Sequence, residues 1–284
     1  MTSPVIDSTL PPTDEISDEE LTEIGRLLSI GRCFDLSVYK AKCMKRRVAI
    51  RMRSTRCRDA AAYCGLLRQN ALELDLLQKT LTIHVSQFFR NPSMFEKLRS
   101  EVLPPLFRAG RNGLAESLRI SCLGCASGEE PYSLAILLRE HFGRELRRTA
   151  TTIFGTDIDA ETLEAARQAE YNEDRLKEVP QETRERYFRR HGARLRLIPE
   201  IREMVTFGQG DIAAVGGYAA SNLVLCRNTL IYFTRPDQER ILNGIADILP
   251  PGGILVLGKS ETMVGDARLR FAPLCTMERI YRRV

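Results

Sequence analysis

Leu118-Arg-Ile-Ser-Cys-Leu-Gly-Cys-Ala-Ser-Gly-Glu-Glu-Pro-Tyr-Ser133 begins as a short apolar run and continues through a loop of small residues. An apolar run of this length, followed by glycine, is typical of a buried strand. The pattern after the loop predicts a helix from about Glu129 to His141. A strand, a tight loop and a helix in this order indicate a parallel sheet covered by helices.

The same alternation continues downstream. We expect a strand at 151–156, a helix at 160–169, and strands at 222–226 and 253–258 separated by a helix at 235–249. Strands that alternate with helices in this way predict an α/β fold with a parallel sheet and helices on both of its faces. Residues 193–207, ARLRLIPEIREMVTF, interrupt the series, and their apolar and polar alternation predicts an inserted β-ribbon.

The N-terminal third has a helical pattern instead. Ser17-Asp-Glu-Glu fits a helix N-cap with a glutamate at the third helical position, and apolar residues then recur at spacings of three and four to about Lys79. We therefore divide the chain into four parts. They are a flexible acidic arm at 1–16, a helical domain at 17–82, a linker and connecting helix at 83–112, and an α/β domain at 113–284 with the ribbon at about 191–207.

Charge is distributed unevenly. Residues 1–23 contain seven acids and no lysine or arginine, so the rest of the chain is more basic than the net charge of +5 suggests. Residues 39–58 contain nine basic residues and no acid, with Met44, Val48 and Met52 on one packing stripe. The side chains expected to face water are Lys45, Arg46, Arg51, Arg53 and Arg56. This basic helix, 40–58, is either a solvated face or a binding face for a polyanion, nucleic acid or a Glu-rich protein helix.

The sequence contains neither a membrane-length apolar run nor a secretory signal, so we expect a cytoplasmic protein without membrane insertion. The eight cysteines are spread through apolar and helical patterns and are expected to be free thiols. Cys122 and Cys125 form a C-x-x-C, which fits a redox pair or half a zinc site. With no second C-x-x-C and no nearby histidine, small residues in a strand and turn explain them better, and no metal is expected.

Polar residues follow several predicted strands, at the edge where ligands bind in open α/β sheets. The loop that begins at Gly124 lacks a full G-x-G-x-x-G, and Glu129 and Glu130 would repel a pyrophosphate. This pattern argues against a dinucleotide. It favours a ligand with a cationic or hydroxyl-rich face.

The other strand ends carry further candidates. Asp157 stands where nucleoside-binding folds hydrogen-bond the ribose hydroxyls. Both Asp157 and Asp159 could instead cap the next helix, and Asp159 suits that role better. Asp211 precedes a Gly-Gly turn and could reach an adenine. The remaining candidates follow the predicted strand at 222–226 and are Arg227, Asn228 and Tyr232.

Residues 84–90, His-Val-Ser-Gln-Phe-Phe-Arg, close the helical region. They fit a linker anchored by Phe88 and Phe89. They also fit a functional segment in which His84, Ser86 and Arg90 point into a cleft between the domains.

Together these segments resemble the CheR family of chemotaxis receptor methyltransferases, from about Ser17 to the C-terminus. The family's Asn-x-Thr-x-Phe-Phe-Arg corresponds to 84–90, its Gly-Cys-Ser-x-Gly-Glu-Glu-Pro-Tyr-Ser to 124–133, its Asp-Ile-Asp to 157–159 and its Cys-Arg-Asn-x-x-Ile-Tyr-Phe to 226–233. Gly258-Lys-Ser-Glu261 and Arg279-Ile-Tyr281 match its C-terminal end. His84 and Ser86 replace the usual asparagine and threonine, and Asp211 stands where asparagine is common. Each change keeps hydrogen-bonding capacity.

The resemblance implies a seven-stranded, Rossmann-like methyltransferase sheet with an inserted β-ribbon and a small helical domain before it. It implies methyl transfer from S-adenosylmethionine to glutamate carboxylates of chemoreceptors, with S-adenosylhomocysteine as the product. The cofactor-binding residues that it implies are His84, Ser86, Arg90, Glu129 or Glu130, Asp157, Asp211, Ile212, Arg227 and Asn228. Arg90 and Tyr232 would lie nearest the transferred methyl group.

On the same resemblance, the basic helix 40–58 would bind the Glu-rich helical coil in the cytoplasmic region of a receptor, and no nucleic acid is expected. Two alternatives remain. One is an RNA or small-molecule methyltransferase, because this fold serves many acceptors, although the chain lacks the clustered aromatic residues that stack unpaired bases. The other is a non-catalytic cofactor-binding module, which the presence of Arg90 and Tyr232 beside the pocket acids disfavours.

Overall fold

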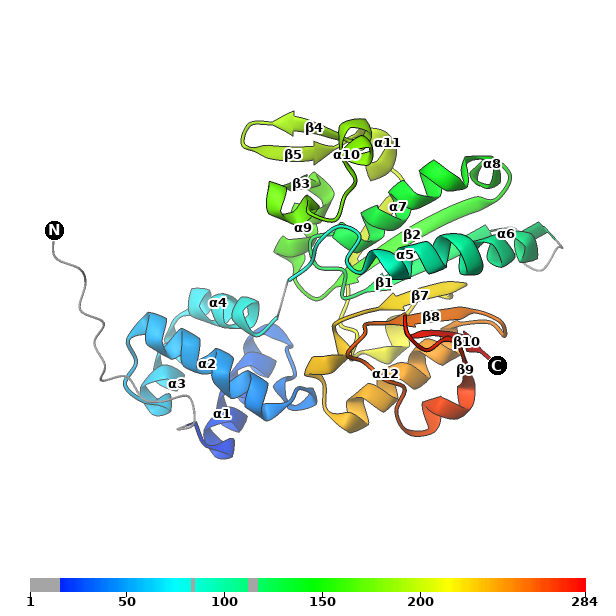
Figure 1. Ribbon diagram of the computed structural model, residues 1–284. Coiled ribbons are helices and arrows are strands. Elements are labelled where there is room, and N and C mark those ends of the chain that lie inside the picture. The colour runs from blue at the N-terminus through cyan, green and yellow to red at the C-terminus, as the bar shows by residue number, and fades with distance from the viewer. Residues whose placement is uncertain (1–15, 83–84, 112–116) are drawn as a thin grey trace. The chain divides into compact units, whose positions relative to one another are not determined.

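The computed structural model describes residues 16–82, 85–111 and 117–284. The chain forms two compact units, which we call the helical unit and the sheet unit (Figure 1). The helical unit comprises residues up to 83 together with 232–234, and the sheet unit comprises 84–231 and 235–284.

The helical unit consists of α1 Asp18–Arg32, the 3-10 turn η1 Leu36–Val38, α2 Ala41–Thr55, α3 Ala60–Gln69 and α4 Ala71–Leu81. The predicted capping box is confirmed, because the Ser17 hydroxyl accepts from the Glu20 amide at 3.1 Å and the Glu20 carboxylate accepts from the Ser17 amide at 2.8 Å. Ile16, which we predicted as the end of a flexible arm, is buried instead. An apolar side chain just before a cap covers the first turn of the helix. Residues 1–15 of the predicted arm lie outside the described residues.

The predicted packing stripe on α2 is confirmed, since Met44, Val48 and Met52 are all buried. The prediction that Arg51 faces water is wrong. Its guanidinium donates to both carboxylate oxygens of Glu73, at 3.0 and 2.6 Å, and Glu73 also accepts from the Tyr63 hydroxyl at 2.8 Å. Lys45 is half-buried and lies 2.8 Å from Asp18. Arg51 therefore points toward Glu73 of α4 and not into solvent, whereas Arg46, Arg53 and Arg56 are exposed.

Residues 232–234 belong to the helical unit although they come late in the sequence. The amide of Lys40 donates to the Tyr232 carbonyl at 2.8 Å, and the amide of Thr234 donates to the Val38 carbonyl at 2.8 Å. Tyr39 and Phe233 form an antiparallel bridge, and their ring centroids lie 4.6 Å apart. Tyr232 is thus held by its backbone against the segment that leads into α2.

The sheet unit contains a seven-stranded sheet in the order β6-β2-β1-β7-β8-β10-β9. Its strands are β1 Ser117–Leu123, β2 Ala150–Asp157, β6 Val205–Gln209, β7 Leu223–Cys226, β8 Ile254–Leu257, β9 Phe271–Cys275 and β10 Ile280–Arg283. The first five are parallel to one another, whereas β10 is antiparallel to both β8 and β9. Every residue of β7 and β8 is buried, as continuous apolar runs in a parallel sheet require. The predicted α/β fold is confirmed.

The strand order reverses between β1 and β7, because β1 leads to β2 on one side and β7 leads to β8 on the other. Right-handed crossovers then place the helix after β1 and the helix after β7 on opposite faces of the sheet, as Figure 1 shows for α7 and α12.

The helices of the unit are α5 Pro92–Lys97, the π-helix η2 Leu98–Val102, α6 Leu103–Arg111, α7 Glu129–His141, α8 Gly143–Leu146, α9 Ala160–Gln168, α10 Gln181–Tyr187, α11 Pro199–Arg202 and α12 Arg235–Ile248. The 3-10 turns are η3 Glu173–Leu176, η4 Val215–Gly217, η5 Leu230–Tyr232, which runs into the helical unit, and η6 Gly265–Arg270.

The inserted ribbon differs from its prediction at 191–207. It is a three-stranded sheet in the order β3-β5-β4, formed by β3 Glu170–Tyr171, β4 Phe188–His191 and β5 Arg194–Leu197. Pro199 ends the ribbon because it lacks the amide that a ladder needs and begins α11. Residues 205–209 are a strand of the main sheet, parallel to β2. The alternating stretch 193–207 therefore does contain strand residues, but they lie in two different sheets, the ribbon and the main sheet.

Candidate active site

The carboxyl ends of the central strands lie side by side. Leu123 at the end of β1 pairs with Thr156 of β2 and with Cys226 of β7, which in turn pairs with Leu257 of β8. The segments that follow these strands therefore meet at one edge of the sheet, beside the point where the strand order reverses. Ligands bind at this edge in open α/β folds.

Asp157 joins two of these segments. It is buried; one carboxylate oxygen accepts from the Ala126 amide at 2.9 Å and the other from the Asp159 amide at 3.1 Å. Asp159 caps α9 by accepting from the amides of Glu161 and Thr162, which confirms its predicted role. The two aspartates are thus divided between the sheet edge and the helix cap.

The loop after β1 is built from residues in the left-handed region. Gly124 and Gly128 have φ values of 69° and 87°, and a Cβ on Gly128 would lie 2.9 Å from the Phe207 ring. Glycine is required there both for its backbone and for space. Because the loop is this compact, α7 begins immediately with Glu129 and Glu130.

The two glutamates face different partners. Glu129 is fully buried, and its carboxylate lies 3.4 Å from the Arg175 guanidinium of η3. The Glu130 carboxylate instead accepts from Arg227 at 2.7 Å. Burial of charge is tolerated where an opposite charge and hydrogen bonds accompany it.

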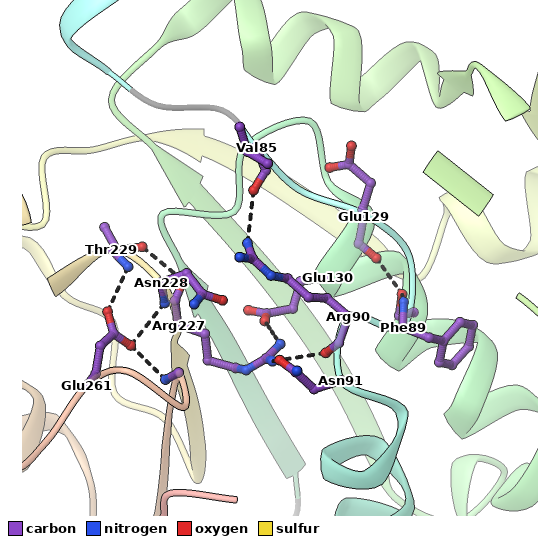
Figure 2. A network of polar contacts seen from close by, with 12 residues as sticks. Val85, Phe89, Arg90, Asn91, Glu129, Glu130, Arg227, Asn228, Thr229 and Glu261 are labelled. Carbon is purple, nitrogen blue, oxygen red and sulfur yellow. Dashed lines mark hydrogen bonds and ion pairs between the residues drawn. The ribbon is translucent and has the colours of Figure 1, made fainter. Parts of the chain in front are cut away.

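Arg227 binds three segments together, as Figure 2 shows. Its Nη1 donates to Glu130, and its Nη2 donates to the Arg90 carbonyl at 2.9 Å and to the Asn91 side-chain oxygen at 2.7 Å. Only 3% of the Arg227 side chain is exposed. A planar guanidinium with these partners fixes the relative positions of the loop before α5, the start of α7 and the end of β7.

The segment before α5 combines anchoring and polar residues. Phe88 is buried and packs edge-on against Tyr171 and Phe188, at centroid distances of 4.8 and 5.2 Å. The Phe89 amide donates to the Ser133 hydroxyl at 2.8 Å, and Arg90 donates from its guanidinium to the Val85 carbonyl at 3.0 Å. Phe88 therefore anchors the segment, as the linker interpretation predicts, and the functional interpretation of His84, Ser86 and Arg90 stays a prediction.

Ser86 and His84 were the other residues predicted in this segment. The Ser86 carbonyl accepts a hydrogen bond from Arg175. His84 lies outside the described residues.

Asp211 and Ile212 follow β6, next to β2. Gln209 at the end of β6 pairs with Asp157, and the Gly210 amide donates to the Asp157 carbonyl at 3.0 Å. Asp211 accepts from the Ala213 amide at 2.8 Å, while Ile212 is buried and its carbonyl accepts from the Tyr218 hydroxyl. Burial raises the pKa of Tyr218, which keeps that hydroxyl a donor.

The sheet unit therefore brings the segments that follow its central strands to one edge, with Glu129, Glu130, Asp157, Asp211, Ile212, Arg227 and Asn228. Arg227 ties the segment that contains Arg90 to this edge. Asn228 lies in a turn with φ of 59°, and its amide donates to Glu261 at 2.9 Å. Tyr232 belongs to the helical unit, so its association with Arg90 stays a prediction.

Three residues of this network were missed from the sequence. Asn91 precedes Pro92 at the start of α5, a position typical of a helix cap, but its side chain accepts from Arg227 and makes no cap bond. Ser133 follows Glu129 by one helical turn and donates to its carbonyl at 2.6 Å, a spacing that could have identified it. No sequence pattern could have identified Arg175, because nothing local in the sequence indicates that η3 lies against residues 86–88.

The surroundings of Cys122 and Cys125 do not favour a reactive thiolate. Cys122, Cys125 and Cys226 are buried, and burial raises the pKa of each thiol well above its ordinary value. A protonated, buried thiol is inert. All eight cysteines are free. Within the described ranges no three His, Cys, Asp or Glu side chains could share a metal ion, and no helix there is long and apolar enough to cross a bilayer.

The donor set suits a particular chemistry. Acids follow β1, β2 and β6, whereas phosphate sites present amides and cations instead. Carboxylates are suited to ammonium and hydroxyl groups, and the amino acid and ribose parts of S-adenosylmethionine carry these groups. A seven-stranded sheet with this set of acids at its switch point defines a methyltransferase that uses S-adenosylmethionine.

The chain belongs to the CheR methyltransferase family. Residues 84–277 match the family's SAM binding domain and residues 19–82 match its all-alpha domain. It is 32% identical over 84% of its length to a chemotaxis protein methyltransferase of Listeria innocua, covering 88% of that protein. It is 32% identical over 94% of its length to the putative methyltransferase Cher3 of Pseudomonas putida, covering 97% of it. A further relative is an uncharacterized 104.1 kDa protein of Rhodobacter capsulatus, 33% identical over 93% of this chain, of which the chain spans 27%.

Proposed function

We propose that this protein transfers the methyl group of S-adenosylmethionine to glutamate side chains in the cytoplasmic region of chemoreceptors. The observation that carries the proposal is the strand-end cluster of acids, tied through Arg227 to the segment that contains Arg90. Relatives from Listeria and Vibrio, named chemotaxis protein methyltransferases, support the acceptor class. We place the activity in the cytoplasm, where these receptor regions lie.

The sheet unit would hold S-adenosylmethionine, which supplies an electrophilic methyl group on a sulfonium when bound. Asp157 would bind the ribose hydroxyls, and Glu129 or Glu130 the amino group. Asp211 and Ile212 would flank the adenine, and His84, Ser86, Arg90 and Asn228 would complete the pocket. Arg227 would act mainly by positioning, because its guanidinium already binds Glu130 and two groups of the 90–91 segment.

The acceptor explains which catalytic groups are needed. A glutamate side chain has an ordinary pKa of about 4.3, so it is already an anionic nucleophile at neutral pH and needs no general base. The protein's task is then to align the carboxylate with the methyl group, an effect that contributes roughly 7–11 kcal/mol in favourable systems. We assign this orientation to Arg90 and Tyr232.

The basic helix α2 would bind the Glu-rich coil of the receptor. Arg46 and Arg53 are exposed on α2, as is Lys42 near its start. Arg51 is excluded from this surface because it binds Glu73. Exposed cations on one helix attract an acidic coil and would direct a glutamate toward the protein.

The test is transfer of a labelled methyl group to membranes that contain chemoreceptors. We expect label that alkali releases, as methyl esters require, and a slower rate of labelling with the Asp157→Ala variant at limiting S-adenosylmethionine. Membranes whose receptors carry glutamine or alanine at the methylated positions are the matched control. Alkali-stable label, or label in added RNA, would contradict the proposal and favour a nitrogen or nucleic acid acceptor.

A further inference from the structure

Glu261 is a buried carboxylate that follows β8 and has no assigned role in methyl transfer. Only 3% of the residue is exposed. One carboxylate oxygen accepts from the amides of Gly258 at 2.6 Å and Asn228 at 2.9 Å, and the other accepts from the amide of Thr229 at 2.8 Å (Figure 2). Glu261 therefore joins the loop after β8 to the turn after β7.

The turn that Glu261 holds has an unfavourable shape for its residues. Asn228 has a φ of 59°, in the left-handed region that asparagine enters at some cost. The Thr229 hydroxyl donates to the Arg227 carbonyl at 3.1 Å. A turn in this conformation persists when surrounding contacts fix it, and two of those contacts come from Glu261.

Close packing surrounds the same turn. A Cβ on Gly258 would lie 2.8 Å from the Asn228 amide nitrogen and 2.8 Å from the Glu261 carboxylate. A Cβ on Gly124, at the start of the loop after β1, would lie 2.7 Å from the Thr229 hydroxyl. The turn therefore packs closely against Gly258 on one loop and Gly124 on the other. A shift of the turn would move the Gly124 loop, which precedes Glu129.

The charge of Glu261 suits this task. Burial raises the pKa of its carboxyl, and the amide bonds from Gly258, Asn228 and Thr229 act in the opposite direction. An ionised carboxylate accepts several hydrogen bonds and donates none, so it matches a concave set of amides. A side-chain amide of the same size would bring a donor against those amides.

We propose that Glu261 is a positioning residue for cofactor binding, which acts by holding the Arg227–Thr229 turn in the shape that the site requires. Arg227 reaches Glu130 and Arg90 from this turn, and Asn228 is a predicted cofactor ligand. The inference rests on the cofactor use in the proposed function and does not depend on the acceptor.

The test compares two buried glutamates of the C-terminal region. Glu261→Gln keeps the size but removes one acceptor oxygen, and Glu278→Gln is the matched control, because Glu278 is also buried but lies 3.4 Å from Lys259. We expect Glu261→Gln to weaken S-adenosylhomocysteine binding by about tenfold or more, measured by calorimetry. We expect Glu278→Gln to bind within about twofold of wild type.

Steady-state kinetics separates positioning from a general loss of structure. In Glu261→Gln the KM for S-adenosylmethionine should rise while the KM for receptor stays unchanged, and its melting temperature should fall no further than that of Glu278→Gln. A variant that was merely less stable would show unchanged KM values for its folded fraction.

Gly258→Ala provides a second variant if Glu261→Gln does not fold. Its methyl group would press on the Asn228 amide and on the Glu261 carboxylate, so we expect the same loss of S-adenosylhomocysteine affinity, while Gly143→Ala, which has space, should bind like wild type. Wild-type affinity in both Glu261→Gln and Gly258→Ala would overturn the proposal. Failure of the wild-type protein itself to bind would instead contradict the proposed cofactor, and binding without ester formation would contradict the acceptor alone.

Discussion

Both units contain an arginine–glutamate pair in which one member is buried and the other is partly exposed. In the helical unit Arg51 donates to Glu73, which also accepts from Tyr63, so the pair joins α2, α3 and α4. In the sheet unit Arg227 donates to Glu130 and also to the 90–91 segment. The chemistry is the same, but the first pair holds helices and the second holds segments that we assign to the cofactor site.

The difference shows that burial of an ion pair does not by itself indicate function. Removing one member leaves an uncompensated charge in either place, so both pairs should matter for stability. Only the sheet-unit pair should also matter for binding, because its arginine sets the positions of Arg90, Asn91 and the start of α7. Variants of the two arginines therefore test the comparison directly.

The largest effects should come from truncating these arginines. Arg51→Ala should lower the free energy of unfolding by about 3–5 kcal/mol and leave S-adenosylhomocysteine affinity unchanged. Arg227→Ala should cost similar stability and weaken that affinity by on the order of a hundredfold. Denaturant unfolding and calorimetry would measure the two quantities. Equal losses of affinity in both variants would remove the distinction.

A smaller effect is expected from Asp157→Ala, which removes a carboxylate that accepts from the backbone amides of Ala126 and Asp159. Loss of charge-assisted bonds to the ribose should weaken S-adenosylhomocysteine binding by roughly 10- to 100-fold. Asp159→Ala is the matched control, because the loss of a helix cap should cost about 1 kcal/mol of stability and leave affinity intact. Calorimetry that gives the two variants the same affinity would take Asp157 out of the site.

Tyr232→Phe tests a residue of the helical unit that we propose for catalysis. We expect kcat to fall by roughly tenfold while S-adenosylhomocysteine affinity stays unchanged, because the lost hydroxyl should act on the acceptor or the methyl group. Single-turnover rates and calorimetry on the same preparation would measure both. Parallel losses would mean that Tyr232 only binds the cofactor.

The smallest effect concerns exposed charges of α2. Replacing Lys42, Arg46 and Arg53 with alanine should raise the KM for receptor by about threefold to tenfold at low salt, and this difference should shrink as salt shortens the Debye length. Replacing Arg144, Arg147 and Arg148, which are exposed in the sheet unit, makes the same charge change as a control. Equal KM values in the two triple variants would indicate a solvated face on α2.

The sequence predicted features that depend on neighbouring residues and missed features that depend on residues far apart in the chain. Local signals were sufficient for α7, observed at the predicted Glu129–His141, and for the caps at Ser17 and Asp159. They failed for Arg51, because its partner Glu73 lies on another helix and periodicity carries no information about it. They also failed for the ribbon, since an alternating run does not state which sheet its strands join.

The site was predictable where it follows strand ends and unpredictable where it depends on long-range contacts. Asp157 and Arg227 each come directly after a predicted strand, so topology alone places them on one edge. Asp211 reaches that edge because residues 205–209, predicted as part of the ribbon, form β6 of the main sheet. Arg175 and Asn91 became visible only through their contacts with Ser86 and Arg227. The two antiparallel strands β9 and β10 were also missed, because short strands with mixed residues lack a clear pattern.

The place of β8 in the sheet has a consequence for how the protein is made. This strand, Ile254–Leu257, lies between β7 and β10 and precedes Glu261, whereas the first loop of the site forms near residue 124. A ribosome adds residues in order, so the turn that contains Asn228 is synthesised before the carboxylate that holds it. If Glu261 positions the turn as proposed, nascent chains stopped before residue 261 should bind S-adenosylhomocysteine at least about tenfold more weakly than the complete chain, although they already contain β1, β2 and β7.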